Sequence, residues 1–383
     1  MRVGLFTESY PPVINGVSTS VATLADQLRQ RGHVPVVVAP NKPGHIDDHP
    51  VTRLPSWTWP LYPGFPFAWP PVGPFARATD RLDLDIVHSH HPFGIGLHAR
   101  RAARRRGIPH VSTFHTLYHD YTHYFPFVTK RVARDWLTGW LHGFYVECDR
   151  IIVPSAHTGK RLLEVGLDAQ RIVVVPTGVP GASPVEAAEV ARFRAQWHLP
   201  EDRPVVLYVG RIAWEKNLRL LIDAFGRLPG DSTLVMVGGG PDFNAIQRSV
   251  EDAGLGERIR FTGPIPRSSL GPVFHSATCF AFPSGTETQG LVLAEAQSHG
   301  LPCVAVDEGG APEFVRNDID ALVVPSRLDP FVEAIARLCA DSELRERFRI
   351  AGLTSPLRIT PEQMVDRILD VYRGALGAEP EGA

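Results

Sequence analysis

The chain has 383 residues, of which 44% are hydrophobic and 21% are charged, and its formal net charge is -2. This composition is typical of folded domains with apolar cores and excludes intrinsic disorder, collagen-like repeats and coiled coils. We find no apolar run of the roughly 18 residues that a membrane-spanning helix needs, and we expect no signal peptide, because the sequence opens on a strand-like segment. The four cysteines are scattered and form no CxxC pair, which argues against a zinc site and a disulfide framework and suits a reducing cytosol.

The charge is distributed unevenly along the chain. Residues 1–178 carry 19 Lys and Arg against 13 Asp and Glu, a net of +6, whereas the remainder carries a net of -8. A basic N-terminal half on a near-neutral chain indicates that one domain faces an anionic surface. Compositional drift between two domains is the alternative explanation.

Short apolar runs alternate with helix-length amphipathic runs in the first half. Continuous Val and Ile character predicts parallel strands that are buried on both faces. We expect such strands at 3–7, 35–39, 85–88, 110–114, 150–153 and 171–175, with helices at 18–31 and 156–165. This βαβ alternation predicts a doubly wound parallel sheet.

The same pattern restarts after a linker at 176–184 that contains Pro and Gly. Strands are expected at 204–209, 233–237, 258–262, 279–283, 302–306 and 321–324, and helices at 217–227, 243–253, 290–299 and 330–340. Two Rossmann-like domains that face each other follow from this repetition. Ligands of such domains bind at the carboxyl ends of the strands.

Two glycine-containing turns are candidate nucleotide sites. The turn after the first strand lacks the GxGxxG of a dinucleotide-binding domain, and Gly238-Gly-Gly-Pro241 lacks the Lys-Ser/Thr of a P-loop. Taken alone, a tight turn between strand and helix is the simpler interpretation of the second one.

The stretch Pro283–Pro302 is the most informative part of the sequence. Glu287 and Glu295 form an E-x7-E pair, and residues 288–290 lie where a helix is expected to begin. Free backbone N–H groups at a helix start bind phosphate. A bare carboxylate pair would be ordinary on an amphipathic helix. The glycine at this helix start and the strand before it favour a ligand site instead.

Several further motifs occur in order along nearly the whole chain. They are Tyr10-Pro-Pro-Val-Ile-Asn-Gly-Val-Ser18, Gly210-Arg-Ile-Ala-Trp-Glu-Lys-Asn217, Val237-Gly-Gly-Gly-Pro241, Phe261-Thr-Gly263 and Glu308-Gly-Gly-Ala-Pro-Glu313. With the E-x7-E stretch they resemble the retaining GT-B glycosyltransferases, a family that includes glycogen synthase-like, sucrose synthase-like and phosphatidylinositol mannosyltransferase-like enzymes.

The resemblance implies an α/β fold of GT-B type, in which two Rossmann-like domains face each other with the active site in the cleft between them. Residues 1–178 would form the acceptor-binding domain, and 179–357 would form the domain that binds the nucleotide-sugar. Residues 358–383 would form a helix that crosses back to the N-terminal domain. Its start is visible in Thr360-Pro-Glu-Gln363, with Thr as N-cap and Pro at the first position.

The resemblance also implies roles for individual residues. The catalytic set would be His115, Arg211, Lys216 and Glu287. His115 and Glu287 would contact the donor sugar, whereas Arg211 and Lys216 would balance the diphosphate charge. No DxD motif is evident, and enzymes of this kind need no metal or other cofactor. Lys216 is also one of only four lysines against 35 arginines.

Donor binding would involve backbone groups as well. Gly16, Val17 and the helix start at Gln289, Gly290 and Leu291 would hold the phosphates. Glu295 would accept ribose hydroxyls, and the stretch from Gly263 to Ile265 would contact the base.

The implied reaction is hexosyl transfer with retention, giving an α-linkage. A front-face path needs no protein nucleophile, because the departing phosphate helps to deprotonate the acceptor. Glu287 acting as a nucleophile, as in retaining glycosidases, is the alternative. We favour the front-face path.

Residues 115–124 resemble the corresponding loop of bacterial diacylglycerol glucosyltransferases, although His119 stands where an acidic residue is expected. The segment Thr286-Glu-Thr-Gln-Gly290 is similar to the matching motif of the same enzymes. The next stretch places apolar residues at i+4 steps beside basic ones, which suits an anionic membrane surface. The residues expected at the acceptor or the membrane are Tyr118, Tyr121, Lys130, Arg131, Arg134, Trp136 and Trp140. An ordinary packed helix with solvated arginines is the alternative.

The roles of two other segments stay open at this point. Residues 54–75 are rich in Trp, Pro and Phe and form either an acceptor-side loop or a loop folded onto the N-terminal core. Residues 100–106 contain five arginines, a second basic cluster.

The sequence therefore predicts a peripheral enzyme on the cytoplasmic face of a bacterial plasma membrane, which transfers a hexose from UDP-glucose or a similar donor to a lipid such as diacylglycerol. A GDP-mannose-dependent α-mannosyltransferase remains an alternative, as does a nucleotide-sugar epimerase, although the motifs argue against the epimerase. Nucleic-acid binding is not expected, because the net charge is near neutral.

Overall fold

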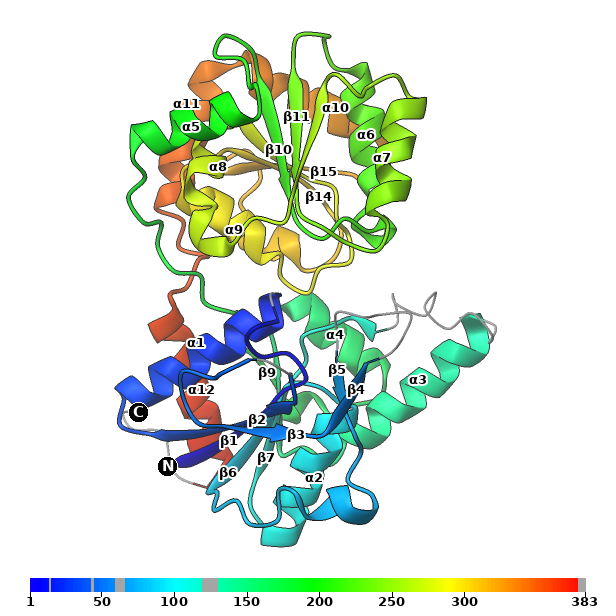
Figure 1. Cartoon of the computed structure of the whole chain (residues 1–383), viewed down its shortest axis with the longest axis vertical. Coiled ribbons are helices and arrows are strands. Elements are labelled where there is room, and N and C mark those ends of the chain that lie inside the picture. The colour runs from blue at the N-terminus through cyan, green and yellow to red at the C-terminus, as the bar shows by residue number, and fades with distance from the viewer. Residues whose placement is uncertain (14, 43–44, 59–65, 119–129, 378–383) are drawn as a thin grey trace. The chain divides into compact units, whose positions relative to one another are not determined.

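The computed structural model describes residues 1–383 except 14, 43–44, 59–65, 119–129 and 378–383 (Figure 1). The chain divides into two units, which we name unit 1 and unit 2. Unit 1 comprises Met1–Gly178 together with Ile359–Ala383, and unit 2 comprises Val179–Arg358. The C-terminal segment thus belongs to the unit that the N-terminal half forms.

Within the described residues, unit 1 contains a seven-stranded sheet of order β3-β2-β1-β6-β7-β8-β9. Every neighbouring pair in it is parallel. Its strands are β1 (Arg2–Phe6), β2 (Val34–Pro40), β3 (Val51–Leu54), β6 (Ile86–Ser89), β7 (His110–Thr113), β8 (Arg150–Val153) and β9 (Ile172–Val174). The order reverses direction between β1 and β6, which is the topological switch point of a doubly wound sheet.

Helices cover both faces of this sheet. The helices are α1 (Gly16–Gln30), α2 (Gly94–Arg106), α3 (Lys130–Tyr145), α4 (Ala156–Glu164) and α12 (Pro361–Ala375). Alternate strand residues face opposite sides, so Val3 and Leu5 pack with α1 and α12, whereas Phe6 packs with α2. Helices α3 and α4 contribute a further apolar cluster with β8.

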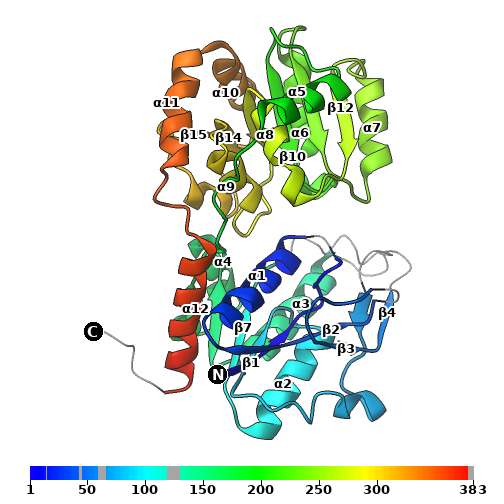
Figure 2. The ribbon, with the colours of Figure 1, turned by 60° about the vertical axis from the view of Figure 1, so that its left-hand side comes forward.

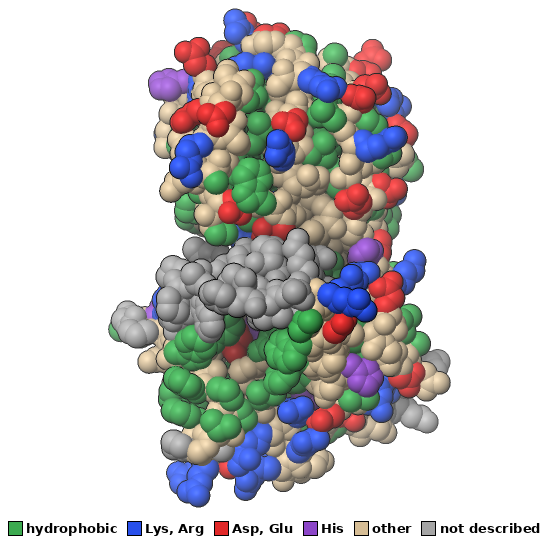
Figure 3. All heavy atoms as spheres, turned by 90° about the vertical axis from the view of Figure 1, so that its right-hand side faces the viewer, with side chains coloured by type: hydrophobic (Ala, Val, Ile, Leu, Met, Phe, Trp, Pro, Cys, Tyr) green, Lys and Arg blue, Asp and Glu red, His purple; other side chains and the backbone are tan. Residues whose placement is uncertain are grey.

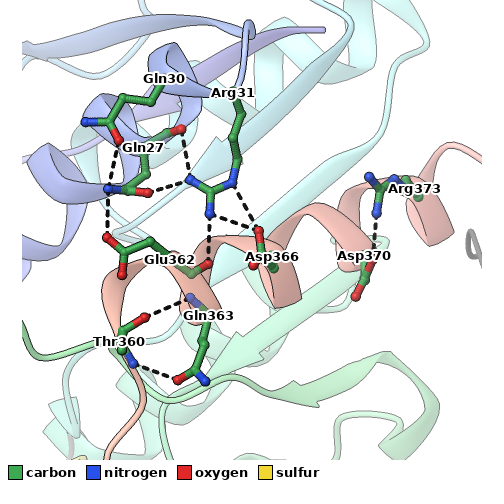
Figure 4. A network of polar contacts seen from close by, with 9 residues as sticks. All are labelled: Gln27, Gln30, Arg31, Thr360, Glu362, Gln363, Asp366, Asp370 and Arg373. Carbon is green, nitrogen blue, oxygen red and sulfur yellow. Dashed lines mark hydrogen bonds and ion pairs between the residues drawn. The ribbon is translucent and has the colours of Figure 1, made fainter.

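Helix α12 lies along α1 (Figures 1 and 2). The Arg31 guanidinium reaches Asp366 at 3.0 Å and the backbone oxygen of Glu362 at 3.2 Å (Figure 4). The start of α12 is a capping box, in which Thr360 and Gln363 bond reciprocally, with Pro361 at the first position. The N-cap and the helix that the sequence predicts here are confirmed.

The aromatic segment after β3 contains a short hairpin of β4 (Ser56–Thr58) and β5 (Pro66–Ala68). Ala68 is buried, and the Trp57 and Phe75 rings lie 6.1 and 5.9 Å from the Trp69 ring. The backbone oxygen of Trp69 lies 2.7 Å from His98 Nε2 of α2. The described part of this segment is therefore folded onto the N-terminal core.

Unit 2 repeats the architecture with six described parallel strands in the order β12-β11-β10-β13-β14-β15. They are β10 (Val205–Val209), β11 (Thr233–Val237), β12 (Ile259–Gly263), β13 (Cys279–Phe282), β14 (Cys303–Val306) and β15 (Ala321–Val324). The switch point lies between β10 and β13.

Two apolar clusters fill the two faces of this second sheet. One is built with α6 (Leu218–Arg227), α7 (Phe243–Asp252), α10 (Leu328–Ala340) and α11 (Ser342–Leu353), and the other with α5 (Ala187–Gln196), α8 (Gly271–His275) and α9 (Leu291–Ser298). The pleat divides each strand between them, so Tyr208 faces the first cluster and Leu207 the second.

The expected α/β class with two parallel-sheet domains is confirmed. Each expected strand and helix is present with ends within about two residues. We did not predict β3 and the β4–β5 hairpin, or helices α2, α5, α8 and α11, from the sequence. Helix α1 begins at Gly16 rather than at residue 18, because the Asn15 side chain caps it by accepting from Ser18 N.

Candidate active site

The charged residues expected at the donor diphosphate and sugar in unit 2 follow the two strands at its switch point. Arg211 comes just after β10, and Glu287 comes in the loop after β13. Because these strands are neighbours and parallel, their carboxyl ends open on the same edge. The fold thus brings together side chains 76 residues apart in the sequence.

The loop that carries Arg211 is held by backbone contacts. Gly210 N donates to Val237 O, and Ile212 N donates to Gly239 O, both at 2.9 Å. A Cβ on Gly238 would lie 1.9 Å from Gly210 O, and one on Gly240 would lie 2.2 Å from Ile212 O. The glycine turn after β11 is therefore required for packing against the Arg211 loop.

Arg211 forms an ion pair with Glu215, a residue that the sequence interpretation missed. Thr286 Oγ1 donates to the backbone oxygen of Glu215 at 3.1 Å, and Tyr208 OH donates to that of Arg211 at 3.0 Å. The sequence spacing indicates this ion pair, because Glu215 stands four residues after Arg211 in the same motif.

Lys216 and Glu287 form the central ion pair, with Lys216 Nζ 2.8 Å from Glu287 Oε1. Their side chains are only 12% and 23% exposed. Ser284 Oγ donates to the same carboxylate oxygen at 3.0 Å. Burial is the largest single influence on Glu287 and raises its pKa. The Lys216 charge, the hydrogen bonds from Lys216 and Ser284 and the Arg211 charge together outweigh burial and hold the pKa below its usual range.

Asn217 joins the two loops of this ion pair. It adopts a left-handed conformation with φ 54° at the start of α6. Its side-chain amide donates to Pro283 O and to Ser326 Oγ, both at 3.2 Å. The Lys-Asn dipeptide thus combines an ion-pairing side chain with the residue that fixes its loop.

Helix α9 begins where the sequence predicts. Gly290 is its N-cap with φ 78°, and a Cβ there would lie 2.9 Å from Ala311 Cβ. Gly310 N donates to Glu287 O at 2.8 Å, so the 308–313 turn supports the Glu287 loop. The first N–H groups of a helix have no acceptor within the helix. Gln289, Gly290 and Leu291 stand at this helix start, two to four residues after Glu287, and helix starts favour anions.

Glu295 of α9 forms an ion pair with Arg267, which lies in the single-turn helix η5 (Arg267–Ser269). Burial raises the pKa of Glu295, and the Arg267 guanidinium opposes this. Gly263 ends β12 with φ 73°, and Ile265 packs against the apolar cluster of α8 and α9. No local sequence pattern indicates the Arg267 contact, since the partners are 28 positions apart.

The expected residues of unit 1 lie at the carboxyl edge of its own sheet. His115 follows β7, and Gly16 and Val17 are the first two residues of α1. Burial lowers the pKa of His115 to about 4, so its imidazole is neutral near pH 7. His115 Nε2 lies 2.9 Å from His90 Nδ1.

Glu8 is a buried carboxyl that the sequence interpretation did not single out. It lies just beyond β1 and accepts from Ala68 N at 3.0 Å and from Ile95 N, in the first turn of α2, at 2.7 Å. Burial raises its pKa to about 8, although both backbone hydrogen bonds act in the opposite direction. Its contacts serve the packing of the hairpin against α2.

The residues expected at the acceptor or the membrane differ in their environments. Trp140 packs against Phe93 with ring centroids 5.9 Å apart and donates to Pro92 O, whereas Trp136 is 54% exposed. Arg131 and Arg134 are exposed as well. Lys130 begins α3, the Tyr118 ring packs edge-on against Phe93 and Phe114, and Tyr121 lies outside the described residues. A surface role on α3 therefore rests on Trp136 and its basic neighbours rather than on Trp140.

The side of unit 1 that carries α3 shows hydrophobic side chains gathered together, with basic side chains near them (Figure 3). The arginines of 100–106 are partly neutralised, because Arg101 and Arg105 pair with Asp80, and Arg104 pairs with Glu147. No helix in the described part of the chain is long and apolar enough to cross a membrane. Over the same residues, no group of three His, Cys, Asp or Glu side chains is placed to hold a metal ion.

Comparison with known proteins divides the chain as the structure does. The sequence pattern of Glycosyltransferase Family 4 matches residues 14–181, and that of Glycosyl transferases group 1 matches residues 189–354. The first match covers unit 1 except β1 and α12, and the second covers the strands of unit 2.

Two relatives are similar over most of their length. An alpha-monoglucosyldiacylglycerol synthase of Acholeplasma laidlawii is 30% identical over 332 residues, which cover 83% of each chain. A GDP-mannose-dependent alpha-mannosyltransferase of Mycolicibacterium smegmatis is 31% identical over 391 residues, which cover 98% of each. These relatives transfer sugars, so the epimerase alternative finds no support.

Among solved structures, Anabaena Alr3699/HepE in complex with UDP-glucose superimposes with a TM-score of 0.76 at 18% identity, covering 98% of this chain and 100% of that one. At this identity the likeness concerns the fold.

Proposed function

Because this chain belongs to the GT-B glycosyltransferases, close to the diacylglycerol glucosyltransferases, we propose that it moves a hexose from a UDP-hexose such as UDP-glucose to a membrane lipid such as diacylglycerol, with retention at the anomeric carbon. The product would be an α-linked glycolipid. The observation that carries this proposal is the Lys216–Glu287 ion pair at the switch point of unit 2, beside the Arg211–Glu215 pair and the start of α9.

The positive groups of this site suit a diphosphate leaving group. Two cationic side chains and the N–H groups of a helix start are a preorganised environment for charge that develops on phosphate oxygens. Both cations already hold carboxylates, so they are fixed before the donor arrives. We propose that Arg211 and Lys216 perform the charge stabilisation and that transfer requires no metal ion.

Glu287 suits a role in stabilising charge more than a role as nucleophile. Its Oε1 accepts from both Lys216 Nζ and Ser284 Oγ, which engages the lone pairs of that oxygen and keeps the group ionised. An anionic carboxylate near the anomeric carbon stabilises an oxocarbenium-like transition state electrostatically. In this front-face path the departing phosphate oxygen takes the proton of the acceptor hydroxyl.

We propose the other donor contacts on the resemblance to the family. Glu295 would accept ribose hydroxyls, residues 263–265 would lie near the base, and Gly16 and Val17 would add N–H groups from α1. His115 of unit 1 would contact the donor sugar and the acceptor hydroxyl.

The acceptor side would be unit 1, with its net charge of +6 over residues 1–178. Exposed Trp136 together with Arg131 and Arg134 on α3 supports docking on an anionic bilayer, since aromatic and basic side chains favour the headgroup region. We place the enzyme as a peripheral protein on the cytoplasmic face of a plasma membrane.

The direct test is incubation of the full chain with UDP-glucose and vesicles of diacylglycerol in anionic lipid, followed by mass and linkage analysis. We expect free UDP and an α-glucosyl lipid, in unchanged yield with a chelator. Lack of any hexosyl lipid with every donor would overturn the proposal, and loss of activity on chelation would overturn its metal-free part. Sedimentation with anionic against neutral vesicles, at low and high salt, tests the docking.

One observation favours a second candidate, a GDP-mannose-dependent α-mannosyltransferase. The Mycolicibacterium relative of that name matches this chain nearly from end to end. A parallel incubation with GDP-mannose separates the two, because the preferred donor would show a higher kcat/KM.

A further inference from the structure

Two buried histidines of unit 1 and the partly buried His115 lie in a row that ends at His115. The ring centroids of His88 and His90 are 4.2 Å apart with planes tilted by 34°, and those of His90 and His115 are 5.2 Å apart with planes tilted by 26°. His88 belongs to β6, His90 follows that strand, and His115 follows β7. We name His88, His90 and His115 the histidine row.

Both nitrogens of His88 are bonded, so the far end of the row is fixed. Its Nδ1 lies 2.6 Å from Tyr372 OH, and its Nε2 lies 2.7 Å from Thr113 Oγ1. Tyr372 belongs to α12 and is fully buried, with its ring edge-on to His88. The C-terminal helix therefore supports the imidazole on which His90 stacks.

The hydrogen bond between His90 and His115 contains one proton. Burial lowers the pKa of all three histidines, to about 4 for His115, and the neighbouring histidine charges act in the same direction on His88 and His90. Each ring is therefore neutral near pH 7 and carries one N–H. In the 2.9 Å contact between His90 Nδ1 and His115 Nε2, one nitrogen donates and the other accepts.

The far nitrogen of His90 decides the direction of this bond. His90 is 2% exposed, and within the described residues its Nε2 is buried with no hydrogen-bond partner. An orphaned buried N–H is rarer in proteins than an acceptor that lacks a donor. The proton of His90 therefore resides on Nδ1, which donates to His115 Nε2. A neutral His115 then carries its own proton on Nδ1.

We propose that His90 is a positioning residue that holds His115 in the Nδ1–H tautomer and in one ring plane, with Tyr372 and His88 as its support. This rests on the proposed function, in which His115 contacts the reacting sugar. With Nε2 occupied as an acceptor, His115 serves as a hydrogen-bond donor and not as the base for the acceptor hydroxyl. That assignment agrees with proton transfer to the departing phosphate.

The first test is 15N NMR of the full chain with labelled histidine and no ligand. We expect His115 with a protonated Nδ1 and an unprotonated Nε2, and a shift toward the other tautomer in His90→Leu. His90→Asn keeps an amide donor near the position of Nδ1 and should keep the tautomer. A protonated Nε2 of His115 in the unaltered protein would overturn the proposal, whether or not the variants fold.

The second test is kinetic. His90→Leu should lower kcat about thirtyfold with donor KM changed less than threefold, His90→Asn should recover most of the loss, and Tyr372→Phe should lower kcat a few-fold. His98→Leu is the matched control, because His98 is also buried with one bonded and one unpartnered nitrogen in the described structure, but lies on α2. A His90→Leu enzyme as active as His98→Leu would contradict the proposal. If the unaltered enzyme transfers no hexose, the proposed function fails, and the NMR result still decides the role of His90.

Discussion

Lys216 carries a charge that the donor site cannot easily replace. Its partner Glu287 is mostly buried, so removing Lys216 leaves a carboxylate with less compensation and takes positive charge away from the diphosphate. We expect Lys216→Ala to lower kcat/KM on the order of a hundredfold, roughly 3 kcal/mol of transition-state stabilisation. The pKa of Glu287 should rise, because burial is then opposed by fewer charges.

Steady-state kinetics with a saturating lipid acceptor measure the effect. Lys160→Ala is the matched control, because Lys160 is exposed on α4 of unit 1. Near-normal turnover of Lys216→Ala would contradict the assignment of Lys216 to the donor site.

Arg267 controls the charge of Glu295. Burial raises the pKa of Glu295, and Arg267 is the group that opposes it. Arg267→Ala should therefore raise that pKa further, so more of the carboxyl is protonated at a given pH and accepts ribose hydroxyls less well. We expect UDP binding to weaken about tenfold, near 1.4 kcal/mol, and the loss to grow as the pH falls.

Calorimetric titration with UDP at pH 6, 7 and 8 checks this prediction. Arg267→Lys should restore most of the affinity. Arg260→Ala is the control, since Arg260 bonds only to backbone oxygens of residues 256 and 257 among its described contacts. A pH-independent loss in Arg267→Ala would show that the ion pair does not govern Glu295.

The candidate site residues within each motif could be predicted from the sequence, but the ion pairs between residues of different motifs could not. Arg211, Lys216 and Glu287 were named through the resemblance of their motifs to known glycosyltransferases, and their positions after β10 and β13 agree with the expected strands. The Lys216–Glu287 contact spans 71 positions, and the Glu295–Arg267 contact depends on how η5 meets α9. Such contacts depend on packing between elements, which local sequence patterns do not determine.

At the scale of elements, the start of α2 is built around a glycine and a buried carboxyl. Gly94 has φ 24°, and a Cβ there would lie 2.3 Å from Glu8 Oε1 and 2.8 Å from Ala68 O. We expect Gly94→Ala to lower the free energy of unfolding by about 3 kcal/mol, since it combines backbone strain with overpacking. Gly107→Ala at the other end of α2 is the control. It also has a positive φ but faces open space, so it should cost only about 1 kcal/mol.

Denaturant unfolding of both variants measures the difference. Equal costs would mean that the Glu8 carboxyl moves away and that the α2 start is not rigidly packed. Circular dichroism under native conditions confirms that both variants fold before the comparison is made.

Most of the helices and strands could be predicted from the sequence, and particular segments show why. Buried parallel strands such as β10 are unbroken apolar runs, and Thr360 with Pro361 marks the start of α12. The hairpin of β4 and β5 could not be predicted, because such short strands, rich in Pro and Trp, lack the alternation of apolar and polar residues that marks a strand. Helix α5 was missed because it follows a linker and buries only Phe193.

The two units as wholes should respond differently to acid. Unit 1 buries five histidines whose pKa is lowered, namely His88, His90, His91, His98 and His110, and it partly buries a sixth, His115. The pKa falls to about 3 for His91 and His110 and to about 4 for His115. In unit 2, the histidines with a lowered pKa are the exposed His275 and the partly buried His299. Burial of neutral imidazoles is thus concentrated in one unit.

The sign follows from proton linkage. A histidine whose folded pKa is depressed stabilises the fold above its unfolded pKa of about 6.5, and this stability is lost as the pH falls, by about 2 kcal/mol per buried ring between pH 7 and pH 5. Glu8 acts in the opposite sense. Its folded pKa is about 8, so its contribution is present below its unfolded pKa and is lost as the pH rises. Lowering the pH from 7 to 5 should therefore raise the free energy of unfolding by about 2 to 3 kcal/mol through Glu8. Five rings outweigh one carboxyl, so unit 1 should lose stability in acid.

Hydrogen exchange at pH 7, 6 and 5, corrected for the intrinsic rate, measures this unit by unit. We expect peptides of β1 and β7 to lose protection as the pH falls while those of β10 and β13 keep most of theirs. Glu8→Gln removes the opposing contribution, so the acid loss of unit 1 should become larger in that variant. Parallel loss of protection in both units would contradict the prediction, as would an acid loss in Glu8→Gln smaller than in the unaltered chain. If unit 1 opens first, the histidine row loses its geometry before the Lys216–Glu287 pair does, so transfer should fail in acid at a pH where unit 2 still binds UDP.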